Sequence, residues 1–172
     1  MTLIASPADT TADRFKACAL PVVESIRAIA RAKGEPYVLD LGCGNGSLTI
    51  PSAVMMPDAM FYGIDADPQM VAQLKKNATV CGAGNIIPMR MGSGIPERCE
   101  TLWGVFSMGL LPTLTHPEAW PILRAIARAL VPGCIARIDA AEYVADLRAW
   151  GLEIKATDVT PFGTFITARK PL

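Results

Sequence analysis

The sequence lacks an excess of charge of either sign, because its 16 Lys and Arg residues balance 16 Asp and Glu residues. Proteins that bind a nucleic-acid backbone usually carry a clear positive excess, so DNA or RNA is not expected as the main partner. Long apolar runs are missing too, since Pro, Arg, Asp or Glu interrupts each run before the roughly 20 residues that span a bilayer. We therefore expect neither a nucleic-acid partner nor a membrane partner.

Cysteine spacing that would indicate a disulfide framework or a metal site is also missing. The five cysteines are scattered without a Cys-x-x-Cys pair, and we expect no secretory segment before them. This pattern favours reduced thiols and a cytoplasmic location. The eight methionines are better explained as core residues than as ligands, so no metal site is expected.

Apolar residues are plentiful, at 51% of a chain of 172 residues, which is enough for one ordered core. We therefore expect a single domain over residues 1–172. Within it, residues 1–10 are expected to be a flexible N-terminus. Residues 11–33 carry apolar side chains at helical spacing, which predicts an N-terminal helix kinked near Pro21.

Short apolar segments that end at glycine or at a polar residue alternate with helical patterns along the rest of the chain. Helices are expected over residues 47–56, from residue 68 onward, and over 117–130 and 141–150. Strands are expected at residues 37–41, 60–64, 85–89, 101–107, 134–139, 153–159 and 163–169. The alternation predicts an α/β fold: a Rossmann-like doubly wound sheet of seven strands, mostly parallel, with one antiparallel strand in a C-terminal hairpin and helices on both faces.

A glycine-rich turn follows the first predicted strand and reads Asp40-Leu-Gly-Cys-Gly-Asn-Gly46. Glycines let a strand turn sharply into a helix and let the backbone approach a ligand, at the sheet edge where open α/β folds bind their ligands. The spacing is Gly-x-Gly-x-Gly, not the Gly-x-Gly-x-x-Gly of dinucleotide sites. Asp40, directly before the turn, repels phosphate but suits an ammonium group. We infer a nucleoside joined to a charged amino acid, without phosphates.

Asp65 ends the second predicted strand and can accept two hydrogen bonds from ribose hydroxyls. Alone it is unspecific, because any junction of strand and loop favours Asp. Together with the glycine turn, however, Asp65 indicates a nucleoside site.

From about residue 14 to residue 171 the chain resembles the class I S-adenosylmethionine-dependent methyltransferases, in their small-molecule, ubiquinone-biosynthesis-like branch. The resemblance rests on the glycine turn, on Asp65, on the turn at 128–133 and on the closing segment 162–171. It implies that S-adenosyl-L-methionine is the cofactor. The residues that it implies for the cofactor site are Asp40, Gly42, Cys43, Gly44, Asn45, Gly46, Asp65, Ala66, Met70, Gly92, Ser93 and Ser107.

The stretch after the third strand departs from the family pattern. Where the family commonly has an Asp that contacts the adenine amine, this chain has Met91. Adenine recognition is therefore expected to rely on backbone groups or on Ser93. The Leu-His-His that often follows the fourth strand is replaced here by residues 108–116.

The resemblance implies an enzyme that moves a methyl group by in-line displacement to O, N or C of a small-molecule metabolite. His116, the single histidine, is the candidate catalytic proton acceptor; the alternative is an exposed residue that helps to cap the next helix. Asp139 and Glu142 are further candidates for orienting the acceptor, although Glu142 is better explained as a first-turn helix carboxylate.

The acceptor pocket is expected between Arg14 with Phe15, the loop 108–116 and the turn 160–163. About two residues separate the fifth strand from the next helix, which leaves no room for a lid. This implies an open pocket, a macromolecular acceptor, or a second copy or partner subunit that completes the site. Two other readings are a non-catalytic S-adenosylmethionine-binding subunit and a Rossmann oxidoreductase, and the glycine spacing and Asp40 disfavour the second.

Overall fold

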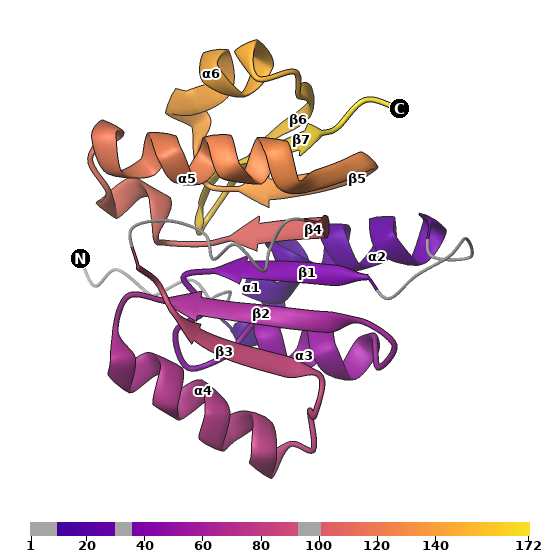
Figure 1. Cartoon of the computed structure of the whole chain (residues 1–172), viewed down its shortest axis with the longest axis vertical. Helices are drawn as coiled ribbons and strands as arrows, with labels where there is room; N and C mark the ends of the chain where they lie inside the picture. Colours follow the sequence, from indigo (N-terminus) through magenta and orange to yellow (C-terminus); the bar gives the residue numbers. More distant parts are fainter. Residues whose placement is uncertain (1–9, 30–35, 93–100) are drawn as a thin grey trace, which may run out of the picture.

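A seven-stranded sheet forms the centre of the computed structural model, which describes residues 10–29, 36–92 and 101–172. Its strands lie in the order β3-β2-β1-β4-β5-β7-β6 (Figure 1). They are β1 (Tyr37–Leu41), β2 (Met60–Asp65), β3 (Ile86–Arg90), β4 (Leu102–Ser107), β5 (Leu130–Ile138), β6 (Glu153–Thr160) and β7 (Gly163–Arg169). The first five strands are parallel, and β7 runs antiparallel to both β5 and β6. The predicted doubly wound sheet with one antiparallel strand is confirmed.

Helices cover both faces of the sheet, as predicted. They are α1 (Thr11–Ala17), α2 (Ala19–Ile29), α3 (Thr49–Met55), α4 (Pro68–Val80), α5 (His116–Ala129) and α6 (Val144–Ala149), with the 3-10 turns η1 (Leu111–Thr113) and η2 (Ala141–Tyr143). One core cluster packs α2 and α3 against side chains such as Val38 and Phe106, and the other packs α5 against Leu39 and Val105. Among the described residues, no helix has both the length and the apolar character needed to cross a membrane.

The predicted single N-terminal helix is wrong. The chain forms two helices instead, and they are separated at Cys18 and not at Pro21. Because α2 starts at Ala19, Pro21 falls in its first turn, where a missing backbone N–H needs no partner inside the helix. Thr10 caps α1 by accepting a hydrogen bond from the Asp13 backbone N–H at 3.2 Å. Residues 1–9 and 30–35, on which the expected flexible N-terminus and the helix end fall, lie outside the described residues.

The fifth strand begins four residues earlier than predicted, at Leu130, and α5 ends at Ala129. The pairing with the C-terminal segment extends back to Gly133, whose N–H donates to the Lys170 carbonyl at 2.8 Å, so Pro132 and Gly133 belong to the strand. These errors concern element ends, where a strand and a helix compete for the same few residues.

The register of the strands determines which strand ends lie side by side. Leu41 pairs with both Ile64 and Ser107, and Ser107 pairs with Ile138. The carboxyl ends of β2, β1, β4 and β5 therefore lie in a row along one edge of the sheet. Residues that follow these strands meet there.

Candidate functional site

The glycine turn after β1 depends on backbone conformations that favour glycine. Gly42, Gly44 and Gly46 have φ values of 80°, 53° and 92°. A Cβ atom added at Gly42 would lie 2.7 Å from Leu110 Cβ, and one at Gly46 would lie 2.5 Å from Leu74 Cδ1. No heavy atom lies within 4 Å of a Cβ added at Gly44. The outer glycines are thus packed, while the central one faces open space that a ligand can approach.

Asp65 is joined to this turn by hydrogen bonds. Its Oδ2 accepts from the Gly44 N–H at 2.8 Å, and its Oδ1 accepts from the Asp67 N–H at 2.9 Å. Each carboxylate oxygen has a further lone pair, so both can also accept from a hydroxyl of a ligand. The structure therefore brings the two strongest sequence features together.

Asp40 lies enclosed below the turn, with 2% of its surface exposed. Its Oδ2 accepts a hydrogen bond from Thr49 Oγ1 at 2.5 Å. Burial raises the pKa of Asp40 to about 7; the Thr49 hydrogen bond lowers this pKa, and the negative charge of Asp65 raises it. Thr49, in the first turn of α3, was not predicted, because only the fold brings it to Asp40.

Cys43 and Asn45 serve the turn itself. Burial, helped by the charges of Asp40 and Asp65, raises the pKa of the Cys43 thiol well above its usual range, so it remains protonated and is a poor nucleophile. The Asn45 carbonyl accepts a hydrogen bond from Asn77 Nδ2 at 2.9 Å, which ties the turn to α4.

The remaining residues predicted for the cofactor lie around Asp65 and at the end of β4. Ala66 is exposed, and Met70 is half-buried in the first turn of α4. The Met91 N–H donates to the Asp65 carbonyl at 2.8 Å, and the adjacent Gly92 is exposed. Ser93 lies outside the described residues.

Ser107 and Asp139 lie at the ends of β4 and β5, and both are buried. The Gly109 N–H donates a hydrogen bond to Asp139 Oδ2, which ties the loop after β4 to β5. Burial raises the pKa of Asp139 to about 6; the N–H groups of Gly109 and Asp139 and the neighbouring Ser107 hydroxyl lower it, and the charge of Glu142 raises it. Among the residues that the structure describes, Ser107 Oγ and Asp139 Oδ1 have no hydrogen-bond partner.

His116 is the first residue of α5 and is exposed. Its ring stacks on that of Tyr143, with the centroids 5.1 Å apart. The helix cap comes from Thr115, whose N–H donates to Glu118 Oε2 at 2.8 Å, and not from His116. The role of His116 as proton acceptor stays a prediction.

Two of the three segments expected to frame the acceptor pocket are in contact, and the third packs against the same core cluster. The Arg14 guanidinium lies 5.7 Å from the centre of the Phe162 ring. Phe15, Met108 and Phe162 pack against the same core cluster, so α1, the loop after β4 and the turn between β6 and β7 lie on one face.

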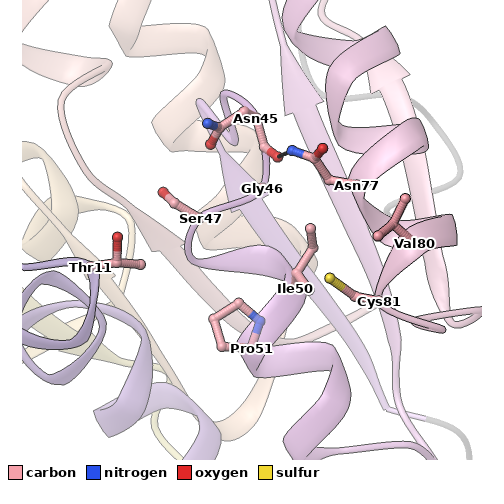
Figure 2. Close-up of a pocket in the computed structure, with 9 residues that line it drawn as sticks. All are labelled: Thr11, Asn45, Gly46, Ser47, Ile50, Pro51, Asn77, Val80 and Cys81. Atoms are coloured by element: carbon pink, nitrogen blue, oxygen red, sulfur yellow. Dashed lines mark hydrogen bonds between the residues drawn. The ribbon is translucent and has the colours of Figure 1, made fainter.

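A pocket of about 350 Å³ borders the glycine turn on the side of α3 and α4. Figure 2 shows the Asn77 amide pointing at the Asn45 carbonyl across one end of it. Its lining residues are Thr11, Asn45, Gly46, Ser47, Ile50, Pro51, Asn77, Val80 and Cys81. In the described parts of the chain, no group of three or more His, Cys, Asp or Glu side chains is arranged to hold a metal ion.

Comparisons with known proteins show the family to which the chain belongs. The family model described as "Methyltransferase domain" matches residues 38–133, more than half of the chain. The ribosomal protein L11 methyltransferase of Rhodopseudomonas palustris is 34% identical over 89 residues, which cover 52% of this chain and 30% of that protein. The aklanonic acid methyltransferase DauC of a Streptomyces species is 36% identical over 80 residues, covering 44% and 36%. The chain thus spans about a third of the length of these two curated relatives.

A solved structure with the same fold is that of magnesium protoporphyrin IX methyltransferase (ChlM) from Synechocystis PCC 6803, which holds S-adenosylmethionine. Its TM-score is 0.61 at 23% identity, with coverage of 87% of this chain and 76% of that one. The similarity covers a larger share of the chain than the segment that the family model matches.

Proposed function

The chain belongs to the class I S-adenosylmethionine-dependent methyltransferases, and from this premise we propose that it methylates O, N or C of a small-molecule metabolite. The observation that carries the proposal is the glycine turn, where Gly44 faces open space and its N–H is held by Asp65 at 2.8 Å. The Asp65 carboxylate, which accepts hydrogen bonds, thus lies beside a stretch of backbone that no side chain covers. A nucleoside would bond to the carboxylate, and the amino acid joined to it would lie along the backbone.

S-adenosylmethionine, the cofactor of this family, supplies an electrophilic methyl group on a positively charged sulfur when it is bound. Asp65 would accept hydrogen bonds from the ribose hydroxyls through its remaining lone pairs. Gly42 to Gly44 would lie along the methionine part, and the enclosed Asp40 would favour its ammonium group through negative charge. The Met91 N–H already donates to the Asp65 carbonyl. Among the described residues, the exposed Gly92 is therefore the candidate whose backbone would contact adenine.

A small-molecule acceptor is favoured by the balanced charge of the chain, which offers no general attraction to nucleic acid. The relative named for aklanonic acid acts on a compound of this kind. The second candidate is a macromolecular acceptor, favoured by the relative named for ribosomal protein L11 and by the two residues between β5 and η2, which leave the acceptor side open. A second copy or a partner subunit that completes this side is part of the same alternative.

The proposed cytoplasmic location rests on thiol chemistry. Cys18, Cys43, Cys81 and Cys134 are free cysteines, as a reducing compartment would maintain them.

The test is methyl transfer from labelled S-adenosylmethionine into a cell extract separated into metabolites and macromolecules. We expect label in the metabolite fraction; label confined to protein or RNA would favour the second candidate. Cofactor binding without transfer into either fraction would support the reading as a non-catalytic subunit. Calorimetric titration with NADH is the control, because tight binding of NADH and none of S-adenosylmethionine would overturn the proposal.

A further inference from the structure

Helix α4 is hydrogen-bonded to the glycine turn through the side chain of Asn77. Its Nδ2 donates to the Asn45 carbonyl at 2.9 Å, across one end of the pocket shown in Figure 2. Gln73, one helical turn earlier, donates from Nε2 to Asn77 Oδ1 at 2.8 Å. Because this bond occupies the amide oxygen of Asn77, the amide nitrogen is the end that faces the turn. The two side chains thus connect the exposed side of α4 to the backbone of the turn.

The bond from Asn77 holds one end of a peptide plane whose other end is also bonded. This plane joins Asn45 to Gly46, and its carbonyl is the one that accepts from Asn77. Its N–H, that of Gly46, donates to the Cys43 carbonyl at 3.0 Å. Gly46 has a φ of 92°, and glycine by itself imposes little preference on φ. The two hydrogen bonds therefore have a large part in setting the orientation of this plane.

The same helix also holds the ribose side of the proposed cofactor site. The Asp67 N–H, at the N-cap of α4, donates to Asp65 Oδ1 at 2.9 Å. The other oxygen of Asp65 accepts from the Gly44 N–H at 2.8 Å. Helix α4 is therefore bonded to both halves of the site, to Asp65 at its start and to the Asn45 carbonyl near its end.

We propose that Asn77 is a positioning residue for S-adenosylmethionine, acting through the Asn45 carbonyl. It fixes the peptide plane within the turn, and with it the place of the Gly44 N–H beside Asp65. This rests on the proposed function and deepens it by assigning a role to a residue outside the glycine turn. Without the Asn77 donor the plane can rotate, and cofactor binding must first restore it, which lowers the affinity.

Three variants of α4 test this role. Asn77→Ala removes the amide, and alanine is well tolerated in a helix. Asn77→His restores a donor, because imidazole Nδ1 is as many bonds from Cα as the Asn nitrogen and can carry a proton. The pocket of about 350 Å³ beside Asn77 has room for the rest of the ring. Gln73→Ala leaves Asn77 in place and removes only the bond that orients its amide.

Asn85→Ala is the matched control, because the Asn85 amide also donates to backbone carbonyls. These carbonyls lie at the opposite end of α3 from the glycine turn and just before β2. They are those of Ala53, Met56 and Ala59, at 3.1, 3.0 and 2.8 Å. Since three carbonyls lose their donor, Asn85→Ala should lower the Tm by about 5 °C. It should leave the glycine turn unchanged.

S-adenosylhomocysteine, which remains after methyl transfer, is the probe, since its binding in calorimetry needs no methyl acceptor. We expect Asn77→Ala to weaken it about 10-fold, Gln73→Ala about 3-fold and Asn77→His less than about 2-fold. Asn85→Ala should also weaken it less than about 2-fold. Thermal melts without ligand should place Asn77→Ala within about 3 °C of the unmodified protein. Binding and stability are thus expected to change in opposite proportion at the two Asn positions.

Unchanged S-adenosylhomocysteine binding in Asn77→Ala would overturn the proposal. Weakening that Asn77→His does not reverse would overturn it too, because loss of the donor would then not be the cause. Equal weakening in Asn85→Ala would do the same, since lower stability would explain both. If Asn77→Ala does not fold, Gln73→Ala decides by the same comparison. If the unmodified protein binds neither S-adenosylhomocysteine nor S-adenosylmethionine, the proposed function itself fails, an outcome distinct from any loss confined to the variants.

Discussion

Two carboxyl groups near the glycine turn, those of Asp40 and Asp139, are buried, and burial changes the pKa of each. Asp40 and Asp139 have pKa values raised to about 7 and about 6, in both cases chiefly by burial. A buried carboxylate without a cation is unfavourable, and a bound ligand with positive charge reverses that. The ionised form of each of these carboxyls therefore destabilises the unliganded fold.

The Asp40→Asn variant tests whether the buried charge of Asp40 lowers the free energy of unfolding. The folded pKa of about 7 lies above the unfolded value of about 3.9, so the folded state holds a proton that the unfolded state releases. Its contribution to stability is complete below about pH 4 and is lost as the pH rises through 7. We expect Asp40→Asn to match the unmodified protein at pH 4 and to be more stable by about 4 kcal/mol at pH 8, measured by urea unfolding.

The Asn oxygen can still accept from Thr49 Oγ1, so the hydrogen bond is kept and only the charge is removed. Asp58→Asn, whose carboxyl is exposed, should show no such pH-dependent gain. An equal change at both pH values would contradict the proposed effect of burial on Asp40.

Among the elements, the glycine turn between β1 and α3 combines a structural and a binding requirement in five residues. Gly46 is packed against Leu74 and has a φ of 92°, whereas Gly44 has open space around it and a φ of 53°. The first position has room for no side chain. The second has room for one, but only where we propose that the cofactor lies.

Alanine at Gly46 should therefore mainly lower stability, whereas alanine at Gly44 should mainly weaken cofactor binding. Gly46→Ala combines a left-handed conformation with a clash and should lower the free energy of unfolding by about 3 kcal/mol. Gly44→Ala should cost about 1 kcal/mol of stability, yet weaken S-adenosylmethionine by about 10-fold or more in calorimetry, because its methyl group occupies the ligand space. A Gly44→Ala variant that binds the cofactor normally would place the ligand elsewhere.

The sequence predicts those elements whose signals are local. The apolar segment of β1, closed by glycine, has the predicted bounds of Tyr37–Leu41, and α4 begins at Pro68 as expected. The break at Cys18 and the early start of β5 were missed because they depend on packing and on pairing with the C-terminal segment. In the site, the turn and Asp65 are visible in the sequence. The Asp139 contact to Gly109 joins residues 30 positions apart and depends on the fold.

At the scale of the whole molecule, the two core clusters are connected through one side chain. Trp103 of β4 packs against both of them, so the two helical layers share a side chain. The proposed cofactor site lies at the ends of β2, β1 and β4, and each of these strands contributes buried residues to both clusters. We therefore expect ligand binding to stabilise the fold as a unit, by an amount that depends on the affinity.

S-adenosylmethionine at 100 times its Kd should add about 2.7 kcal/mol to the free energy of unfolding. For a chain of 172 residues this corresponds to a rise in Tm of about 5–10 °C. Asp65→Asn replaces one carboxylate oxygen by an amide, so one of the Gly44 and Asp67 N–H groups loses its acceptor and ribose binding weakens. If the affinity falls about 10-fold, the rise at the same ligand concentration should be about half as large. A thermal melt with and without ligand, run on both proteins, measures the two rises, and an undiminished rise in Asp65→Asn would remove Asp65 from the cofactor site.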